Sequence, residues 1–277
     1  MWVWTKLSAA KWRDAWEERF HALDNTNLVI TELAGKPTVR VEIYCQRQAD
    51  AQRIKREFGG TVRQLKACNW AAMAVPQIAP IKIRDRLLIV SESDDDALAS
   101  HRAAHPTRHV LSIPVEMAFG TGDHPTTATC LRLLCDLPLA GASLLDLGCG
   151  TGVLAIAAKK LGAQAVEGFD FDPAAVTAAR KNARRNGVRI PFARIDVLQW
   201  HPEKTYDFIL ANIFADVLTA SYPTMKKALN PSGTLILSGV LDKHAPDLLQ
   251  EGHRAGFDFQ SVIQRGKWVT AVAKIRH

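Results

Sequence analysis

Glycine recurs at alternate positions in one short stretch, LLDLGCGTG, at Gly148, Gly150 and Gly152. An apolar run precedes these glycines and an alanine-rich apolar run follows them, so the motif joins a predicted buried strand to a predicted helix. Glycines let the backbone bend sharply and approach a ligand, and the free N–H groups at the start of a helix favour a carboxylate, such as that of a methionine group. The motif alone leaves three alternatives open: S-adenosylmethionine, NAD or a tight structural turn.

Acidic residues end the next two predicted strands. Asp170 lies 22 residues after Gly148, where a carboxylate can accept both hydroxyl protons of a ribose. Asp172 directly precedes Pro173, so we expect Asp172 to cap the following helix and Asp170 to be the ligand. Asp196 ends the third strand and is predicted to accept a hydrogen bond from an adenine amine, the alternative being a solvated loop carboxylate.

The fourth predicted strand ends in ANIF, which contains Asn212 and Phe214. A dehydrogenase has no general need for asparagine at this point. An enzyme that methylates nitrogen must hold an uncharged amine with its lone pair aimed at the methyl group. We therefore predict that the side-chain carbonyl of Asn212 orients an acceptor amine and that Phe214 walls the site. The alternative is that Asn212 caps the next helix.

A second glycine-rich stretch, AFGTGDHPTT, leads into another predicted helix. Asp123 or His124 is expected near its N-cap, with Pro125 in the first turn. Thr127 then lies in the first turn, where its hydroxyl can face a ligand. Together with Phe119, this loop is typical of a lid over a cofactor, although a structural loop would also need the glycines.

Strand and helix patterns alternate regularly from residue 143 onward. The strand-like runs are SLLDLG, AVEGFD, FARID, YDFILAN and GTLILSG. Such alternation predicts an α/β fold, a parallel Rossmann-like sheet with helices on both faces, in which ligands bind at the carboxyl ends of the strands. The last two runs, FDFQSVIQ and KWVTAVAKI, are separated by a short turn, so we expect an antiparallel hairpin at the sheet edge.

The N-terminal residues follow another order. Residues 1–66 alternate as strand, helix, strand, strand, helix, strand, which predicts a small ferredoxin-like α+β domain. This part carries no cluster of titratable groups, so we interpret it as a recognition module. Residues 67–110 are predicted to be a connector, and residues 111–277 to be the catalytic domain.

Histidines and cysteines do not predict a metal site. His101, His105 and His109 recur every four residues, but Pro106 interrupts the helix that would bring them together. The five cysteines form no CxxC pair and are expected to be buried free thiols rather than disulfides or zinc ligands.

Composition excludes several classes of protein. The chain has 277 residues, 47% of them hydrophobic and 23% charged, with a net charge of +7, which argues against disorder. No run approaches the roughly 18 apolar residues of a membrane span, and the first residues lack a signal-peptide pattern, so we expect a cytoplasmic protein with no membrane partner. The charge permits an acidic partner such as ribosomal RNA.

Together, AFGTGDHPTT, LLDLGCGTG, GFDFDP and ANIF resemble the PrmA-type methyltransferases, a family that modifies amino groups of the large-subunit ribosomal protein L-eleven (L11). The pattern AFGTG-x-HPTT is rather specific, whereas the glycine motif is shared by most S-adenosylmethionine enzymes of this fold. The resemblance extends from about Ile113 to the C-terminus and, in element order, over the N-terminal domain, which in that family grips the protein substrate. It implies a seven-stranded class I methyltransferase sheet, S-adenosylmethionine as cofactor and ribosomal protein L11 as substrate.

The resemblance also implies site residues. The family's cofactor positions correspond to Thr127, Gly148, Asp170 and Asn212. Two positions depart from the family pattern, because Asp123 stands where threonine is usual and Asp216 where glycine is usual. Asp123 can still cap the helix, whereas Asp216 adds a negative charge beside the expected acceptor pocket and favours a cationic or a different substrate.

The expected reaction is a single displacement. A lysine or N-terminal amine loses its proton in a desolvated pocket and attacks the sulfonium methyl group, with no metal and no covalent enzyme intermediate. Three alternatives remain. The first is a methyltransferase of the same fold that acts on another protein lysine or on a small amine. The second is an NAD-dependent oxidoreductase, which the motif GxGxG in place of GxGxxG disfavours, and the third is a catalytically silent ribosome-binding protein. We expect a monomer with a mobile N-terminal domain.

Overall fold

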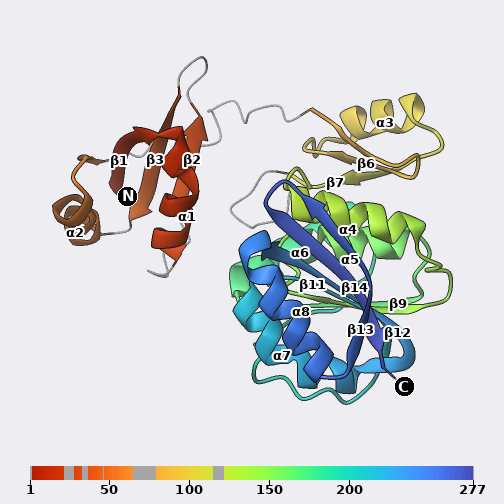
Figure 1. Ribbon diagram of the computed structural model, residues 1–277. Helices are drawn as coiled ribbons and strands as arrows, with labels where there is room; N and C mark the ends of the chain where they lie inside the picture. Colours follow the sequence, from red (N-terminus) through yellow and green to blue (C-terminus); the bar gives the residue numbers. More distant parts are fainter. Residues whose placement is uncertain are drawn as a thin grey trace. The chain divides into compact units, whose positions relative to one another are not determined.

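The computed structural model describes residues 2–21, 28–32, 37–45, 47–64, 79–114 and 122–276. The chain divides into two compact units, Met1–Ala74 (unit 1) and Val75–His277 (unit 2). Figure 1 shows the elements of both units and labels many of them. None of the helices in these ranges is long and apolar enough to cross a membrane.

Unit 1 is a four-stranded antiparallel sheet with two α-helices. Its elements are β1 (Trp2–Ala9), η1 (Ala10–Trp12), α1 (Arg13–His21), β2 (Leu28–Glu32), β3 (Thr38–Cys45), α2 (Gln48–Phe58) and β4 (Thr61–Gln64). The strands lie in the order β2-β3-β1-β4, and all neighbours are antiparallel. This order of elements and strands is that of a split βαβ unit.

Aromatic side chains fill the core of unit 1. Trp4 of β1 is fully buried, and its ring lies 5.6 Å from that of Phe20 and 6.4 Å from that of Phe58. Its indole N–H donates a hydrogen bond of 2.6 Å to the carbonyl of Gly59, where α2 ends. A large buried aromatic whose one polar atom is satisfied stabilises so small a domain.

Unit 2 contains the seven-stranded sheet. Its elements from residue 125 onward are α4 (Pro125–Asp136), β8 (Ser143–Leu147), α5 (Val153–Lys160), β9 (Ala165–Asp170), α6 (Pro173–Arg185), β10 (Phe192–Arg194), β11 (Tyr206–Asn212), α7 (Ala215–Ala228), β12 (Leu229–Leu241), η3 (Asp242–His244), α8 (Ala245–Arg254), β13 (Phe257–Arg265) and β14 (Trp268–Ile275). The strand order is β10-β9-β8-β11-β12-β14-β13. The first five strands are parallel, and β14 is antiparallel to both of its neighbours. The predicted α/β fold and its C-terminal hairpin are confirmed.

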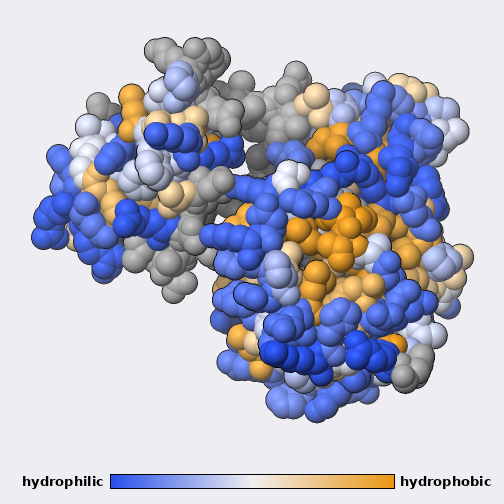
Figure 2. Space-filling model, in the orientation of Figure 1, coloured by the Kyte–Doolittle hydropathy of each residue, from blue (hydrophilic) through white to orange (hydrophobic). Residues whose placement is uncertain are grey.

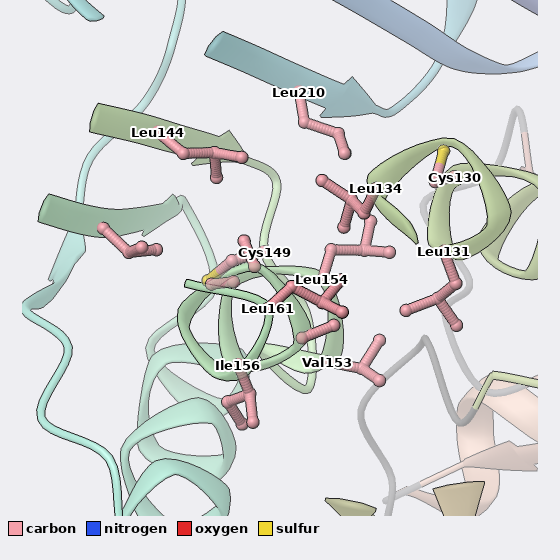
Figure 3. Close-up of a cluster of buried hydrophobic side chains, with 14 of the residues drawn as sticks. Cys130, Leu131, Leu134, Leu144, Cys149, Val153, Leu154, Ile156, Leu161 and Leu210 are labelled. Carbon is pink, nitrogen blue, oxygen red and sulfur yellow. The ribbon is translucent and has the colours of Figure 1, made fainter. Parts of the chain in front are cut away.

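Period-two alternation along the strands divides the core between the two faces of the sheet. Leu144 and Leu210 belong to one buried cluster, with residues of α4, α5 and α6, whereas Leu145 and Ile209 belong to another, with residues of α7 and α8. Figure 3 shows the first cluster, in which side chains of α4 and α5 meet those of β8 and β11. Helices therefore cover both faces and leave the strand ends as the place for a ligand.

Residues 81–112 form regular structure where the sequence suggests a connector. They contain β5 (Ile81–Ile83), β6 (Leu87–Val90), α3 (Asp95–Ala104) and β7 (His109–Ser112), in a sheet of order β5-β6-β7 within unit 2. An acidic run, SESDDD at residues 91–96, contains the start of α3. Asp94 accepts a hydrogen bond of 2.8 Å from the N–H of Ala97, and acidic residues follow in the first turn, where the helix dipole favours them. The predicted connector residues 67–78 lie outside the described ranges.

Four of the five cysteines, Cys45, Cys130, Cys135 and Cys149, are free and buried, as predicted. Cys68 lies outside the described residues. Within the described ranges, no group of three or more histidine, cysteine, aspartate or glutamate side chains is placed to hold a metal ion. The helix containing His101 ends at Ala104, and His109 lies in β7.

Candidate active site

The predicted site residues gather at one edge of the large sheet. In the parallel register Leu147 of β8 pairs with Phe169 of β9 and with Ala211 of β11, so these three strands end side by side. Asp170 in turn pairs with Arg194 of β10. The glycine motif, Asp170, Asp196 and Asn212 each lie at or just after one of these carboxyl ends, which is where α/β sheets bind ligands.

The glycine loop after β8 is fixed against the end of β9. The N–H groups of Gly148 and Cys149 both donate to the carbonyl of Phe169, at 2.8 and 2.9 Å. Gly148 has a φ of +71°, and a Cβ at this position would lie 2.1 Å from the side chain of Ile213. Only glycine therefore fits, and the loop passes close to the segment that follows Asn212.

Asp170 joins the glycine loop to the start of α6. One carboxylate oxygen accepts a hydrogen bond of 2.9 Å from the N–H of Gly150, and the other accepts one of 3.0 Å from the N–H of Asp172. Burial raises the pKa of Asp170, and these hydrogen bonds oppose that rise. A carboxylate oxygen has two lone pairs, so both oxygens retain capacity for ribose hydroxyls.

The predicted cap of α6 is confirmed. Asp172 is the N-cap of α6, and its side chain accepts a hydrogen bond of 2.8 Å from the N–H of Ala174, with Pro173 in the first turn. Asp170 is not the N-cap of this helix, and its role as a cofactor ligand stays a prediction.

Asp196 is half-buried in the turn after β10. Its side chain accepts a hydrogen bond of 3.0 Å from the N–H of Leu198, which orders the turn. Leu198 is 55% exposed and Phe171, directly after Asp170, is 69% exposed. Sequence analysis did not single out these two apolar side chains. Their exposure beside the two carboxylates suits contact with the flat face of an adenine, and the adenine role of Asp196 stays a prediction.

Asn212 ends β11 with one satisfied and one unsatisfied polar group. Its amide nitrogen donates to the hydroxyl of Thr127 at 3.5 Å, a long hydrogen bond. Its carbonyl oxygen is buried and has no hydrogen-bond partner among the described residues. The N-cap of α7 is Phe214, with no side-chain hydrogen bond, so Asn212 does not cap that helix. A buried acceptor without a donor costs free energy, so a bound group that donates a hydrogen bond to this oxygen would be favoured.

Gly239 of β12 lies against this asparagine, and sequence analysis missed it. Its φ is +83°, and a Cβ here would lie 2.7 Å from the carbonyl oxygen of Ile213 and 3.2 Å from the side-chain oxygen of Asn212. β11 and β12 are neighbours in the sheet, so the missing side chain makes room for the turn after β11.

His124 caps α4 and holds Thr126 in the first turn. It is the N-cap residue, which settles the choice between Asp123 and His124: its Nδ1 accepts from the N–H of Thr126 at 3.4 Å and lies 2.7 Å from the Thr126 hydroxyl. Its ring lies 4.8 Å from that of Trp268 in β14. Figure 2 shows hydrophobic residues gathered on this face of unit 2, around α4 and β14. The predicted lid residue Phe119 lies outside the described residues.

Asp146 is a buried carboxylate that the sequence analysis did not assign. It lies in β8 and is fully buried, and one oxygen accepts a hydrogen bond of 3.1 Å from the N–H of Ala155 in α5. The other oxygen has no partner among the described residues. Burial raises its pKa to about 7, and the charge of Asp170 adds to the rise. A carboxylate inside an otherwise apolar strand is the signal that could have revealed it.

The edge thus combines a tight glycine loop that leads into a helix, a carboxylate with free lone pairs and a buried amide oxygen with no donor among the described residues. These groups can bind a nucleoside and orient an amine, and none of them is a nucleophile paired with a base. The sequence model described as ribosomal protein L11 methyltransferase (PrmA) matches residues 14–276. The chain belongs to this family.

Individual relatives agree with the family match. The chain is 38% identical over 207 residues to the ribosomal protein L11 methyltransferase of Hydrogenovibrio crunogenus, covering 75% of this chain and 67% of that protein. It is 39% identical over 187 residues to that of Cupriavidus pinatubonensis, covering 68% and 60%. With that of Vibrio campbellii it is 33% identical over 250 residues, covering 90% and 77%. The chain therefore spans about three fifths to two thirds of the length of the first two relatives.

A solved structure of the same kind is also similar. The ribosomal protein L11 methylase of Lactobacillus delbrueckii subsp. bulgaricus superposes with a TM-score of 0.64 at 28% identity, covering 72% of this chain and 99% of that one. Membership in this family of S-adenosylmethionine-dependent methyltransferases confirms the resemblance, the fold class and the cofactor that the motifs predict. It excludes the NAD-dependent oxidoreductase.

Proposed function

We propose that this chain transfers methyl groups from S-adenosylmethionine to amino groups, of lysine or of the N-terminus, in ribosomal protein L11. The proposal is based on the buried side-chain oxygen of Asn212, which has no hydrogen-bond donor among the described residues. Asn212 lies at the end of β11, at the same edge of the sheet as the glycine loop and Asp170. An amine is the donor that this acceptor lacks. The names of the relatives support ribosomal protein L11 as the substrate.

The residues present fit the cofactor. Gly148 and Gly150 lie in a loop that leads into the N-terminus of α5, where N–H groups favour the methionine carboxylate. Asp170 has lone pairs left for both ribose hydroxyls, and Asp196 would accept from the adenine amine. When bound, S-adenosylmethionine would supply an electrophilic methyl group: an amine nitrogen takes it in a single displacement, in which the bond from sulfur to methyl breaks and S-adenosylhomocysteine leaves.

The protein's own contribution to the reaction is binding, alignment and exclusion of water. The oxygen of Asn212 accepts a hydrogen bond from the amine, and Thr127 holds the amide from its other side. An apolar surrounding disfavours the charged form of a lysine, so the amine releases its proton to solvent before it attacks. Alignment of the lone pair with the methyl group then lowers the barrier.

Several further assignments belong to the same proposal. Residues 1–66 recognise the protein substrate and residues 111–277 perform catalysis. Asp216, exposed in the first turn of α7, attracts the cationic lysine before it is deprotonated. The protein acts in the cytoplasm as a monomer and makes a weak contact with ribosomal RNA.

A second candidate is methylation of another protein lysine or of a small amine, which the unusual carboxylate of Asp216 favours. The test is transfer of labelled methyl groups from S-adenosylmethionine to purified ribosomal protein L11 and to total ribosomal proteins, followed by mass spectrometry. Label on lysine or the N-terminus of L11 supports the proposal. Cofactor binding with label only on other proteins moves the substrate to another amine, and no cofactor binding at all supports a silent ribosome-binding protein.

A further inference from the structure

One segment of unit 2 contains many cationic residues and no carboxylate. Between Pro173 and Arg194 the chain has six arginine or lysine residues and no aspartate or glutamate. These residues are Arg180, Lys181, Arg184, Arg185, Arg189 and Arg194. They lie on α6, on the segment that follows it and on β10, which is the edge strand of the sheet. We call them the α6 basic surface.

The helix arranges four of these cations in two rows. Arg180 and Arg184 are four residues apart, as are Lys181 and Arg185, so each pair lies on one face of the helix, one turn apart. Ala179 and Ala183 are buried in the core, and Arg180, Lys181 and Arg184 are exposed. Arg189 is exposed in the segment that follows. The α6 basic surface is therefore one side of a helix and the adjacent sheet edge.

Uncharged groups hold three of the guanidinium groups in place. Arg180 donates two hydrogen bonds, of 3.1 and 2.5 Å, to the carbonyl of Phe192, and Arg194 donates one of 3.1 Å to the carbonyl of Phe171. Arg185 donates one of 2.7 Å to the side-chain oxygen of Asn182. These bonds restrict the side chains without neutralising them, which reduces the entropy lost when an anion binds.

No described carboxylate forms a salt bridge with the five arginines of this surface; the ion pairs seen within the described ranges involve other residues. Like charges four residues apart on a helix repel each other. The helix dipole offsets this only in the last turn, which contains Arg184 and Arg185. The arrangement costs stability, and the five arginines have no carboxylate partner among the described residues.

We propose that the α6 basic surface binds the phosphate backbone of RNA without sequence specificity. Arginine forks match phosphate oxygens in geometry, and a row of cations along a helix and a sheet edge suits a linear polyanion better than a single ion. The choice of RNA among polyanions rests on the proposed function, because a ribosomal protein as substrate is met together with RNA. The inference gives the enzyme a second contact, which reaches the carboxyl edge of the sheet only at Arg194, beside Phe171.

The test compares two double variants of the full chain. Arg184→Gln with Arg189→Gln removes two exposed cations of the α6 basic surface whose side chains form no hydrogen bond or ion pair with other described residues. Lys227→Gln with Lys274→Gln is the matched control, because it removes two exposed cations of unit 2, one in the last turn of α7 and one in β14. Neither pair belongs to the cofactor or acceptor site, so both variants should methylate free ribosomal protein L11 at the wild-type rate.

The readout is fluorescence anisotropy of a labelled, mixed-sequence single-stranded RNA of about 20 nucleotides, titrated at several salt concentrations. Each phosphate contact adds about 0.7 to the slope of log Kd against log salt, so loss of two contacts should lower the slope by about 1.4. The control variant should keep the wild-type slope. Equal slopes for wild type and the α6 variant, or an equal loss in the control, would overturn the proposal.

A competition experiment separates RNA from an acidic protein as the partner. Polyglutamate at the same charge concentration should displace the RNA poorly, and displacement as effective as that by unlabelled RNA would overturn the assignment to RNA. Failure of the proposed function is distinguishable, because it would appear as absent methylation of ribosomal protein L11 by the wild type while the salt slopes stayed as expected.

Discussion

Replacement of Asn212 by alanine should separate the stability of the protein from its activity. The side-chain oxygen of Asn212 is buried without a partner among the described residues, and its amide makes one long hydrogen bond of 3.5 Å to Thr127. An unpaired buried polar group costs about 1–3 kcal/mol, and a hydrogen bond contributes about 0.5–1.5 kcal/mol. Removal of the unpaired oxygen offsets the lost bond and packing, so the free energy of unfolding should change by less than about 1 kcal/mol.

The rate of methyl transfer should fall far more than stability. Without the acceptor oxygen the amine is no longer held in line with the methyl group, and misplacement of a reacting group by about 1 Å can cost about 100-fold in rate. This corresponds to about 2.7 kcal/mol in the activation barrier. The two effects of one substitution therefore differ clearly in size.

Asn186 provides the matched control. It is also buried, but its amide donates to the carbonyls of Ser112 and Asn182, both at 2.9 Å, and its oxygen accepts from the N–H of Ser112 at 2.9 Å. Asn186→Ala removes three satisfied bonds and should lower the free energy of unfolding by about 2–4 kcal/mol, with the rate of the folded fraction unchanged. Urea denaturation gives the stability and single-turnover transfer of labelled methyl groups gives the rate. Wild-type rate in Asn212→Ala, or destabilisation equal to that of Asn186→Ala, would refute the reasoning.

Three further outcomes follow from the same site. Gly239→Ala forces an L residue to a φ of +83° with its Cβ 2.7 Å from the carbonyl oxygen of Ile213. The substitution should therefore lower the free energy of unfolding by about 2–4 kcal/mol, and an unchanged melting temperature would contradict this. Thr127→Val removes the hydroxyl that holds Asn212 and should slow methyl transfer by about 2- to 10-fold, whereas Thr127→Ser should retain the rate, as single-turnover assays can show. Burial raises the pKa of Asp146 from 3.8 to about 7, so the folded state binds the proton more tightly than the unfolded state. The contribution of this proton to the free energy of unfolding is fully present below a pH of about 4 and is lost as the pH rises to about 7. Over that range the free energy of unfolding should fall by up to about 1.4 kcal/mol per pH unit. Denaturation curves of Asp146→Asn should lack that slope, and a slope equal to that of the wild type would assign the pH dependence to other groups.

Local sequence rules identify much of the site. The roles of Asp170 and Asp172 could be separated because a helix that begins with proline needs its cap directly before it, and Asp172 stands there. The glycine loop and the strand ends follow from the alternation of strands and helices, and residues at the ends of parallel strands gather at one edge. The choice between Asp123 and His124 as cap could not be made from sequence, since both can accept a hydrogen bond.

Contacts between distant segments could not be predicted. Gly239 and Asn212 lie on neighbouring strands, but nothing in the sequence around Gly239 indicates which side chain it faces. The structure of residues 81–112 could not be predicted for a related reason. The stretch IKIRDRLLIV looks like one strand, but it contains two short strands, β5 and β6, that form a hairpin. The acidic run suggests a solvated loop, although it contains the start of a helix. Short elements carry little periodicity, so their pairing decides their structure.

We expect the cofactor to bind at the carboxyl edge of the sheet with its ribose on Asp170. Titration calorimetry of S-adenosylhomocysteine against wild type, Asp170→Ala and Asp172→Ala measures this contact, because the last variant removes only the cap of α6. Loss of two hydrogen bonds to a charged group, at about 1.5 kcal/mol each, should weaken binding to Asp170→Ala by about 100-fold. Asp172→Ala should bind as the wild type does. Wild-type affinity in Asp170→Ala would contradict the account and place the ribose elsewhere.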